Sequence, residues 1–240
     1  LMFAVFFIYP ICTLLRQAFT TKEAAFTLDN FVKFFSKPYY YNTIFNSFKV
    51  SLAVMAVSLA IGIVMSYFYS FYELKGSKFI LISSILCCMS APFIGAYAWI
   101  LLLGRSGAMT LLLKALGIKV GSIYGFGGIL LVQATKLYPL VMIYMNGMFA
   151  NLDNSLMEAS SNLGCTGLRR FFSVVLRLSM PTILAAALLV FMRAFADFGT
   201  PILIGEGYRT FTVEIYKQFL SETGSDYGFA AAISVIAIIL

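Results

Sequence analysis

The 240-residue sequence predicts an all-α protein that crosses a membrane several times. Hydrophobic residues make up 61% of the chain and charged residues 11%, whereas an ordinary soluble domain is about 25% charged. The charge-poor segments are long enough for membrane helices, which need about 20 apolar residues each. They lack the period-2 alternation of transmembrane β-strands, so we expect helices that satisfy their own backbone hydrogen bonds in lipid.

Six apolar segments follow one another, so about six transmembrane helices are expected in a single transmembrane domain over residues 1–240. The first and last segments run into the ends of the sequence, and we expect both ends to be cropped. The second and third contain no charged residue, and the tight turn between them predicts antiparallel neighbours. The segments are 1–15, 50–72, 79–104, 127–149, 180–198 and 228–240.

Two connections are long enough to carry structure of their own. Residues 16–41 are polar and aromatic, and the three tyrosines at 39–41 are expected at a membrane interface. Residues 104–125 are rich in glycine and are expected to hold a short surface helix at 109–116. The glycine cluster at 124–128 is not followed by Gly-Lys-Ser or Gly-Lys-Thr, so it is not a phosphate-binding loop, and ATP must bind another chain.

Charge and reactive side chains exclude several classes of function. Lys and Arg number 17 against 10 Asp and Glu, a net charge of +7, but the basic residues are spread singly, so we expect membrane-surface charge and no nucleic-acid partner. The absence of histidine removes the usual general base and every histidine-containing zinc site. The four cysteines have no C-x-x-C spacing and are expected to be unpaired. We expect no catalytic residue, no metal site and no cofactor in this chain.

Residues 150–181 are neither strongly apolar nor loop-like, and they predict two short helices. Ser155 and Glu158 have the S-x-x-E spacing of a capping box at the start of the first helix. Gly164 is expected to end that helix, because the residue after a helix often takes a left-handed conformation that costs another residue roughly 1–2 kcal/mol. Thr166 is expected to cap the second helix.

This segment resembles the EAA loop of ABC importer permeases. The family pattern is Glu-Ala-Ala, three residues, Gly, then an aromatic residue, an aliphatic residue and prolines. It stands here as Glu158-Ala159-Ser160, Gly164, Phe171, Val174, Leu176 and Pro181. Two positions depart from it: Ser160 replaces the third alanine, and Arg177 replaces the proline usual after Leu176, so the proline-induced bend lacks its usual residue.

The resemblance implies the type I ABC importer permease (MetI-like) architecture, with 150–179 as a cytoplasmic coupling loop and 72–78 on the same side. Charge bias between the loops does not fix this orientation by itself. The implied partners are an ABC ATPase dimer that carries ATP and Mg, an extracytoplasmic substrate-binding protein, the lipid bilayer, and a second permease domain as homodimer, heterodimer or fused half. The implied location is the bacterial plasma (inner) membrane. The residues implied to couple to the ATPase are Leu156, Glu158, Ala159, Ser160, Gly164, Phe171 and Phe172.

Three further motifs resemble the ferric-iron permease branch, at 103–107, 123–125 and 195–201. That branch often carries two six-helix units in tandem, so this unit is expected to be one half of a longer protein. The implied function is the permease subunit that forms an alternating-access pathway for ferric iron. No carboxylate cluster in the spans offers the oxygen ligands that ferric iron favours, so 2-aminoethylphosphonate, polyamine, thiamine and sulfate remain alternatives.

Three charged residues inside the expected spans are candidates for lining the translocation pathway. An unpaired charge at membrane depth costs about 2.5–3.5 kcal/mol on insertion scales, so Lys136 should face the bundle interior or a wet cavity, unless it snorkels along its helix. Arg193 and Asp197 are four residues apart and are expected to pair on one helix face. The alternative role for this pair is at the outer mouth of the pathway. Lys136 and Arg193 also suit an anionic cargo such as a phosphonate.

An ion-gradient-driven secondary transporter is the alternative class of function. It would need intramembrane carboxylates or broken helices, and Asp197, near a span end, is the single candidate in the sequence. A membrane-embedded enzyme would need His, Asp, Glu or Cys side chains that converge at one depth, and the sequence predicts no such set.

Overall fold

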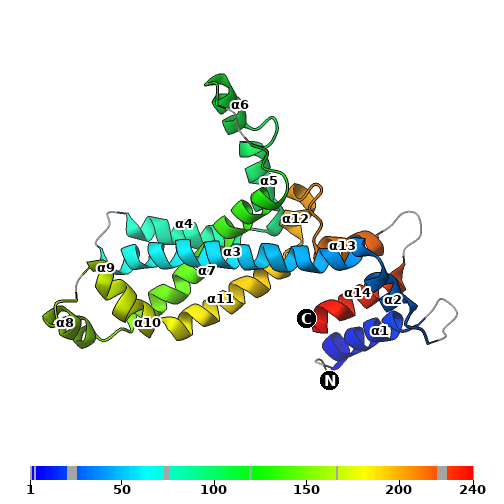
Figure 1. Ribbon diagram of the computed structural model, residues 1–240, viewed down its shortest axis with the longest axis horizontal. Helices are drawn as coiled ribbons and strands as arrows, with labels where there is room; N and C mark the ends of the chain where they lie inside the picture. Colours follow the sequence, from blue (N-terminus) through cyan, green and yellow to red (C-terminus); the bar gives the residue numbers. More distant parts are fainter. Residues whose placement is uncertain are drawn as a thin grey trace. The chain divides into compact units, whose positions relative to one another are not determined.

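The computed structural model describes residues 2, 4–20, 26–72, 76–118, 121–165, 167–220 and 226–239. Most of these residues are helical, and within these ranges no strand is present apart from an isolated bridge between Thr20 and Phe26. Figure 1 shows the helices, and the prediction of an all-α protein is confirmed. They form a terminal unit, Leu1–Phe48 with Gly207–Leu240, and a central unit, Lys49–Glu206.

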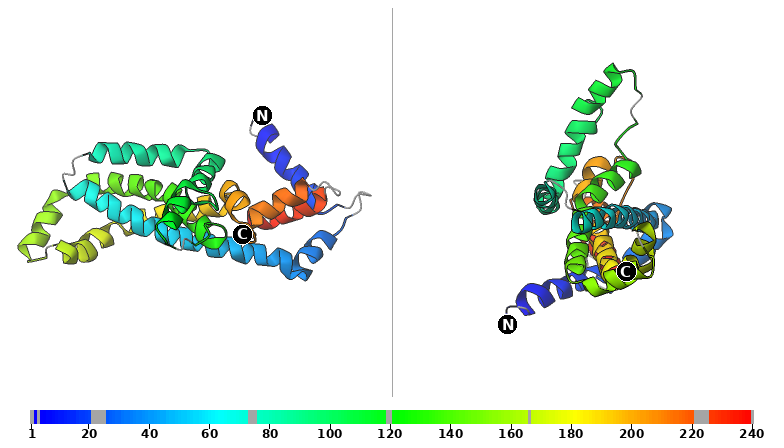
Figure 2. Two further views of the ribbon diagram at one scale, coloured as in Figure 1. Left: turned by 90° about the horizontal axis from the view of Figure 1, so that it is seen from above. Right: turned by 90° about the vertical axis from the view of Figure 1, so that its left-hand side faces the viewer.

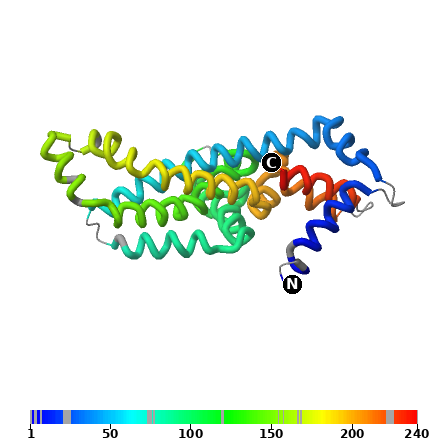
Figure 3. The backbone as a smooth tube through the Cα atoms, turned by 90° about the horizontal axis from the view of Figure 1, so that it is seen from below, coloured from blue at the N-terminus to red at the C-terminus, as the bar shows by residue number. Residues whose placement is uncertain are grey.

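The central unit is built around helix α7 (Phe126–Ala150), whose buried side chains include Ile129, Val132 and Met142. Helix α3 (Pro38–Phe71) begins in the terminal unit and continues into the central one. Helices α3, α4 (Ser77–Met89), α7 and α11 (Met180–Phe195) run side by side (Figures 1 and 3), whereas α5 (Pro92–Leu103) and α6 (Ala108–Ala115) project away from them (Figure 1). Helix α7 contacts α3, α4, α5, α11 and α12 (Gly199–Ile204).

Helices α3 and α7 approach closely through small and polar residues, as is common between membrane helices. A Cβ atom on Gly62 would lie 2.5 Å from the Cβ of Val141. A larger residue at position 62 would therefore push the two helices apart. One turn nearer the end of α3, the Ser66 hydroxyl donates to the Asn146 Oδ1 at 2.5 Å.

Two of the predicted spans differ from the observed helices for local reasons. The prediction of one continuous helix over 79–104 is wrong, because α4 ends at Met89 and the next helix, α5, begins at Pro92. Ala91 is extended, with ψ 144°, because the ring of a following proline disfavours the helical conformation. The span predicted at 50–72 begins earlier, at Pro38, so the three tyrosines lie in the first turn of α3.

By length and composition, three helical stretches of the described residues could cross a membrane, and a fourth could if a bent pair counts as one span. The bent pair is Phe171–Leu178 with Met180–Phe195, inclined by 66°. The three stretches are Pro38–Phe71, Pro92–Ala115 and Phe126–Ala150. The stretches Lys78–Met89 and Tyr227–Ile239 are apolar but shorter. The short helix predicted at 109–116 is present as α6. It belongs to the stretch Pro92–Ala115 that could cross a membrane, so its place at the membrane surface stays a prediction.

The terminal unit has a small core of its own, formed mainly where helices α1 (Tyr9–Ala18) and α14 (Tyr227–Ile239) meet. Lys33, on α2, forms a 2.9 Å salt bridge with Asp226, and its ammonium group lies 4.2 Å from the ring centre of Phe229. The other helices of the terminal unit are a π-helix at Ala4–Ile8, α2 (Asp29–Ser36) and α13 (Phe211–Phe219). The buried residues of the cluster where α1 and α14 meet are Ala18, Ala231, Ala232 and Val235.

Candidate functional site

The segment that resembles the EAA loop begins with helix α8 (Asn154–Asn162), which Asp153 caps. The Asp153 Oδ1 accepts a 2.9 Å hydrogen bond from the Ser155 backbone N–H. Hydrogen bonds from Ser155 hold the pKa of the Asp153 carboxyl below its ordinary value of 3.8. The predicted capping box of Ser155 and Glu158 is therefore wrong, because an aspartate one residue before the helix takes the capping position.

Gly164 ends α8 in the left-handed conformation, with φ +74°, as predicted. Its N–H donates to the Ser161 carbonyl at 2.9 Å, and the Cys165 N–H donates to the Ser160 carbonyl at 2.9 Å. This pair of bonds is the Schellman motif, which satisfies carbonyls left open at a helix end. A Cβ built on Gly164 meets nothing within 4 Å, so backbone conformation, and not space, favours glycine. The predicted cap Thr166 lies outside the described residues.

Helix α8 lies at one end of the central unit (Figure 2), and one of its edges is apolar and exposed. Leu156, Ala159 and Leu163 follow helical spacing, and the side chains of Leu156 and Leu163 are 46% and 86% exposed. Glu158 is also exposed, whereas Ser160 is buried, with 8% of its surface exposed. The exposed edge is accessible to another protein, whereas Ser160 lies on the buried face of α8.

The second half of the segment turns back toward the membrane helices in short pieces. They are α9 (Gly167–Arg170), the π-helix η2 (Phe171–Val175) and α10 (Leu176–Leu178). The 66° bend into α11 falls at Ser179, whose hydroxyl donates to the Val175 carbonyl at 2.6 Å. Pro181 occupies the first turn of α11. The bend is therefore present although Arg177 stands at the usual proline position.

Phe171 joins this segment to the membrane helices, while its neighbour Phe172 stays 59% exposed. The Phe171 ring meets the Tyr67 ring of α3 edge to face, with 4.7 Å between centroids. Four residues along α3, Phe71 packs against Phe149 of α7 at 5.5 Å. The contact between Phe171 and Tyr67 therefore connects η2 to the end of α3.

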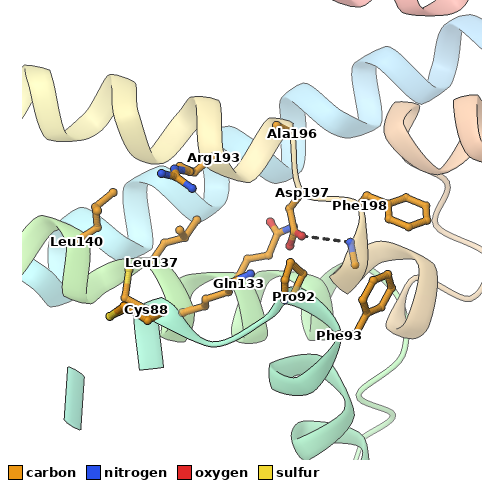
Figure 4. Close-up of a pocket in the computed structure, with 13 residues that line it drawn as sticks. Cys88, Pro92, Phe93, Gln133, Leu137, Leu140, Arg193, Ala196, Asp197 and Phe198 are labelled. Atoms are coloured by element: carbon orange, nitrogen blue, oxygen red, sulfur yellow. Dashed lines mark hydrogen bonds between the residues drawn. The ribbon is translucent and has the colours of Figure 1, made fainter. Parts of the chain in front are cut away.

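A cavity of about 480 Å³ lies in the central unit, where the break between α4 and α5 faces the break between α11 and α12 (Figure 4). A Cβ atom on Gly199 would lie 2.6 Å from the Cβ of Pro92, so the two breaks touch. The rings of Phe93 and Phe198 pack edge to face at 5.9 Å. The residues that line the cavity are Cys88, Met89, Pro92, Phe93, Gln133, Lys136, Leu137, Leu140, Arg193, Ala196, Asp197, Phe198 and Gly199.

All three predicted pathway residues line this cavity. The pairing of Arg193 with Asp197 stays a prediction. Asp197 lies past the end of α11 and accepts hydrogen bonds from the Gln133 Nε2 at 3.0 Å and the Thr200 hydroxyl at 2.6 Å. Its other oxygen accepts the Gly199 N–H at 3.2 Å. Asp197 thus joins α7 to the start of α12.

Sequence reasoning missed Gln133. Its side chain is 1% exposed, and while its Nε2 binds Asp197, its Oε1 has no hydrogen-bond partner among the described residues. A signal was available, because a lone amide in an apolar run must find partners once it is buried. In the described residues no group of three or more His, Cys, Asp or Glu side chains could hold a metal ion. The four cysteines are free, as expected.

Curated relatives include permeases for different cargoes at similar identity. The chain is 26% identical over 236 residues to the ferric transport system permease protein FbpB of Actinobacillus pleuropneumoniae, covering 98% of this chain and 34% of that protein. It is 26% identical over 249 residues to the putative 2-aminoethylphosphonate transport system permease protein PhnU of Salmonella paratyphi A, covering 100% and 84%. It is 26% identical over 240 residues to the spermidine/putrescine transport system permease protein PotB of Haemophilus influenzae, covering 96% and 84%.

A solved structure shares the fold. The crystal structure of a bacterial ABC transporter involved in the import of the acidic polysaccharide alginate matches with a TM-score of 0.80 at 20% identity, covering 99% of this chain and 87% of that chain. The chain spans about a third of the length of the ferric relative, 34%. The family model for the binding-protein-dependent transport system inner membrane component matches residues 58–240, which include both the α8 segment and the cavity. The chain therefore belongs to the family of binding-protein-dependent transport system inner membrane components.

Proposed function

We propose that this chain is the permease subunit of an ATP-binding cassette importer, and that it forms an alternating-access pathway through the bacterial inner membrane. The observation that carries the proposal is the α8 segment. It offers an exposed apolar edge, is held by the left-handed Gly164, and contacts α3 through Phe171 and Tyr67. Such a segment can receive a movement from a partner protein and pass it to a membrane helix.

The proposed partners follow from the family and from what this chain lacks. An ATPase dimer would hold ATP and Mg and would bind the exposed edge of α8, where Leu156, Glu158, Ala159 and Phe172 are accessible. A second permease domain would complete the pathway. An external binding protein would deliver the cargo, as the solved relative in complex with an alginate-bound periplasmic protein suggests. No covalent chemistry is proposed for this chain.

Ferric iron is the first cargo to test, because the ferric relative and the three ferric-type motifs both favour it. 2-Aminoethylphosphonate is the second candidate, and one observation favours it. Lys136 and Arg193 both line the cavity, and cationic side chains attract an oxyanion and repel a metal cation or a polyamine. Thiamine and sulfate remain further alternatives, and no specific observation favours either of them.

The test is affinity purification of the full-length protein from its native membrane, with mass spectrometry of the proteins, metals and small molecules that co-purify. We expect an ATPase subunit with the wild type and with Gly164→Asn, since asparagine tolerates the left-handed conformation. We expect about tenfold less of it with Gly164→Val, because valine at this φ costs roughly 1–2 kcal/mol and opens the turn.

Gly147→Ala is the matched control, because Gly147 lies in α7 and a Cβ there meets nothing within 4 Å. This variant should retain the ATPase. The proposal would be overturned if no ATPase co-purified with this chain while other membrane complexes were recovered intact from the same extract. Transport driven by an ion gradient in its place would then favour a secondary transporter.

A further inference from the structure

Helix α7 contains a buried proline in its interior, and the helix nevertheless continues from Phe126 to Ala150. Proline has no backbone N–H and clashes with the carbonyl four residues earlier, so Pro139 leaves the Thr135 carbonyl without its usual partner in the helix. An unpaired carbonyl between membrane helices is costly because lipid offers no donor, and a neighbouring helix commonly supplies one. The Thr135 carbonyl therefore needs a donor from outside α7.

That donor comes from α4, which runs beside α7 (Figure 3). The Cys87 thiol donates to the Thr135 carbonyl, with 3.8 Å between the sulfur and the oxygen. A thiol is a weak donor, but water, which would compete with it, is scarce between membrane helices. Three residues before Cys87, the Ser84 hydroxyl lies 3.2 Å from the Tyr138 hydroxyl. Helix α4 therefore contacts the proline turn of α7 through two polar side chains.

Helix α3 also reaches this turn. The Ser58 hydroxyl belongs to a fully buried residue and donates to the Ala134 carbonyl at 3.4 Å. A Cβ atom on Gly62 would lie 2.9 Å from the Tyr138 carbonyl oxygen, so the backbones of α3 and α7 are close together. Side chains of two neighbouring helices therefore donate to successive carbonyls of the turn that precedes the proline.

A second feature favours bending of α7 at the same place. The Thr135 hydroxyl donates back to the carbonyls of Leu131 and Val132, at 2.9 Å and 3.0 Å. Back-bonding of this kind slightly destabilises a helix and often bends it, and sharp kinks in helices commonly fall at proline. Two features that permit bending therefore lie about one helical turn apart.

This turn separates two functional parts of α7. Before Pro139, the side chains of Gln133 and Lys136 line the cavity. After it, the Met148 Sδ lies 3.2 Å from the Ser179 hydroxyl, at the bend into α11. Helix α7 thus joins the cavity to the bend that follows the α8 segment, and bending at Pro139 changes the direction of one part relative to the other.

From these contacts we infer that Pro139 is a hinge of α7 and that Cys87 is a positioning residue, which keeps the hinge helical by donating to the Thr135 carbonyl. The hinge passes to the cavity the movement that the α8 segment receives from the ATPase. The inference rests on the proposed function and adds to it the helix through which the ATPase acts on the pathway.

The role of Cys87 is tested by a double-mutant cycle with Pro139. The purified full-length protein is unfolded in mixed micelles with increasing dodecyl sulfate. We expect Cys87→Ala to raise the equilibrium constant for unfolding about threefold, as is typical of a hydrogen bond between membrane helices. In a Pro139→Ala background Cys87→Ala should have no effect, because position 139 then offers its own N–H to the Thr135 carbonyl.

Two further variants control this cycle. Cys87→Ser keeps a donor and should unfold as the wild type does. Cys12→Ala removes an exposed thiol of α1 and should also leave unfolding unchanged. An equal effect of Cys87→Ala in both backgrounds means that the side chain only packs against α7, and that result, or no effect in either background, overturns the assignment of Cys87.

The hinge is tested by ATP hydrolysis of the full permease complex in proteoliposomes with the loaded binding protein. We expect Pro139→Ala to lower kcat severalfold with an unchanged KM for ATP, because a regular helical turn bends less readily than one with proline. Pro139→Gly also lacks the ring but leaves the turn flexible, so it should retain most of kcat. Full kcat in Pro139→Ala, or equal losses in both variants, overturns the hinge. A purified complex without the ATPase overturns the proposed function instead.

Discussion

At the scale of single residues, Asp153 determines where the segment after α7 becomes helical as α8. The carboxylate of Asp153 accepts a hydrogen bond from the backbone N–H of Ser155, and hydrogen bonding to Ser155 lowers the pKa of Asp153 below 3.8. A lowered folded-state pKa means that the cap stabilises α8 in full above pH 3.8 and is lost as the pH falls through the lowered value. Near pH 7 we expect Asp153→Ala to reduce the hydrogen-exchange protection of α8 a few-fold, on the order of 2 to 10.

Asp153→Asn is the matched variant, because its amide oxygen keeps an acceptor that does not titrate. The hydrogen-exchange protection of α8 in Asp153→Asn should therefore persist at every pH. The difference between wild type and Asp153→Ala should disappear as the pH falls through the lowered pKa of Asp153, where the carboxyl becomes protonated. A difference that persists in strong acid, or an Asn variant as unprotected as the Ala variant, would contradict the assignment of Asp153 as the cap.

The sequence predicted Gly164 correctly but not the residues around it, and the reason is local. A glycine just past a polar helix is typical of a left-handed residue that ends the helix, whereas Asp153 and Ser155 are both good caps two residues apart. Propensity alone does not choose between them. Gln133 was missed for a different reason: it is uncharged, and its importance depends on Asp197, which lies 64 residues away in sequence.

At the scale of helix pairs, Gly62 sets the distance between α3 and α7. We expect Gly62→Ala to lower the melting temperature of the detergent-solubilised chain by several degrees, because the added methyl overpacks the seam at a cost of about 1–3 kcal/mol. Gly147→Ala on α7 has no close neighbour, so replacement of a helical glycine should leave stability unchanged or raise it by roughly 0.5–1 kcal/mol. Equal melting temperatures for Gly62→Ala and the wild type would contradict the close approach.

The contact of Tyr67 with Phe171 is the proposed link between η2 and α3. We expect Tyr67→Ala to reduce ATP hydrolysis stimulated by the loaded binding protein in proteoliposomes, while Tyr67→Phe, which keeps the ring, retains it. A double-mutant cycle on the stability of the pair should give a coupling energy of about 0.5–1.5 kcal/mol. Stimulated hydrolysis in Tyr67→Ala equal to that of an exposed-tyrosine control, Tyr144→Ala, would contradict the link.

The helices themselves were largely predictable, and their interruptions were not. A long apolar run predicts a helix because lipid offers no other hydrogen-bond partners, and 127–149 accordingly matches α7. The break before Pro92 was a missed local signal, since the residue before a proline avoids the helical region. The early start of α3 at Pro38 could not be predicted from hydropathy, because the residues between Pro38 and Lys49 are mixed in polarity and belong to the terminal unit.

At the scale of the whole molecule, the proposed function requires that the α8 segment and the loop before α7 lie on opposite sides of the membrane. Helix α7 has 25 residues, or about 37 Å at 1.5 Å per residue, which exceeds a hydrocarbon core of about 30 Å. Ser122 and Ser155 flank α7, and both are exposed. Coupling to a cytoplasmic ATPase requires that Ser155 face the cytoplasm and Ser122 the opposite side.

Cysteine labelling in intact cells tests this orientation. The four native cysteines are first replaced by serine, and Ser122→Cys and Ser155→Cys are then introduced one at a time. We expect a membrane-impermeant maleimide to label Ser122→Cys in intact cells and Ser155→Cys only after permeabilisation. The two variants are matched controls for each other, because each adds one exposed thiol in place of a hydroxyl. Labelling of Ser155→Cys in intact cells would place α8 outside, where no ATPase could drive it, and the importer mechanism would fail with it.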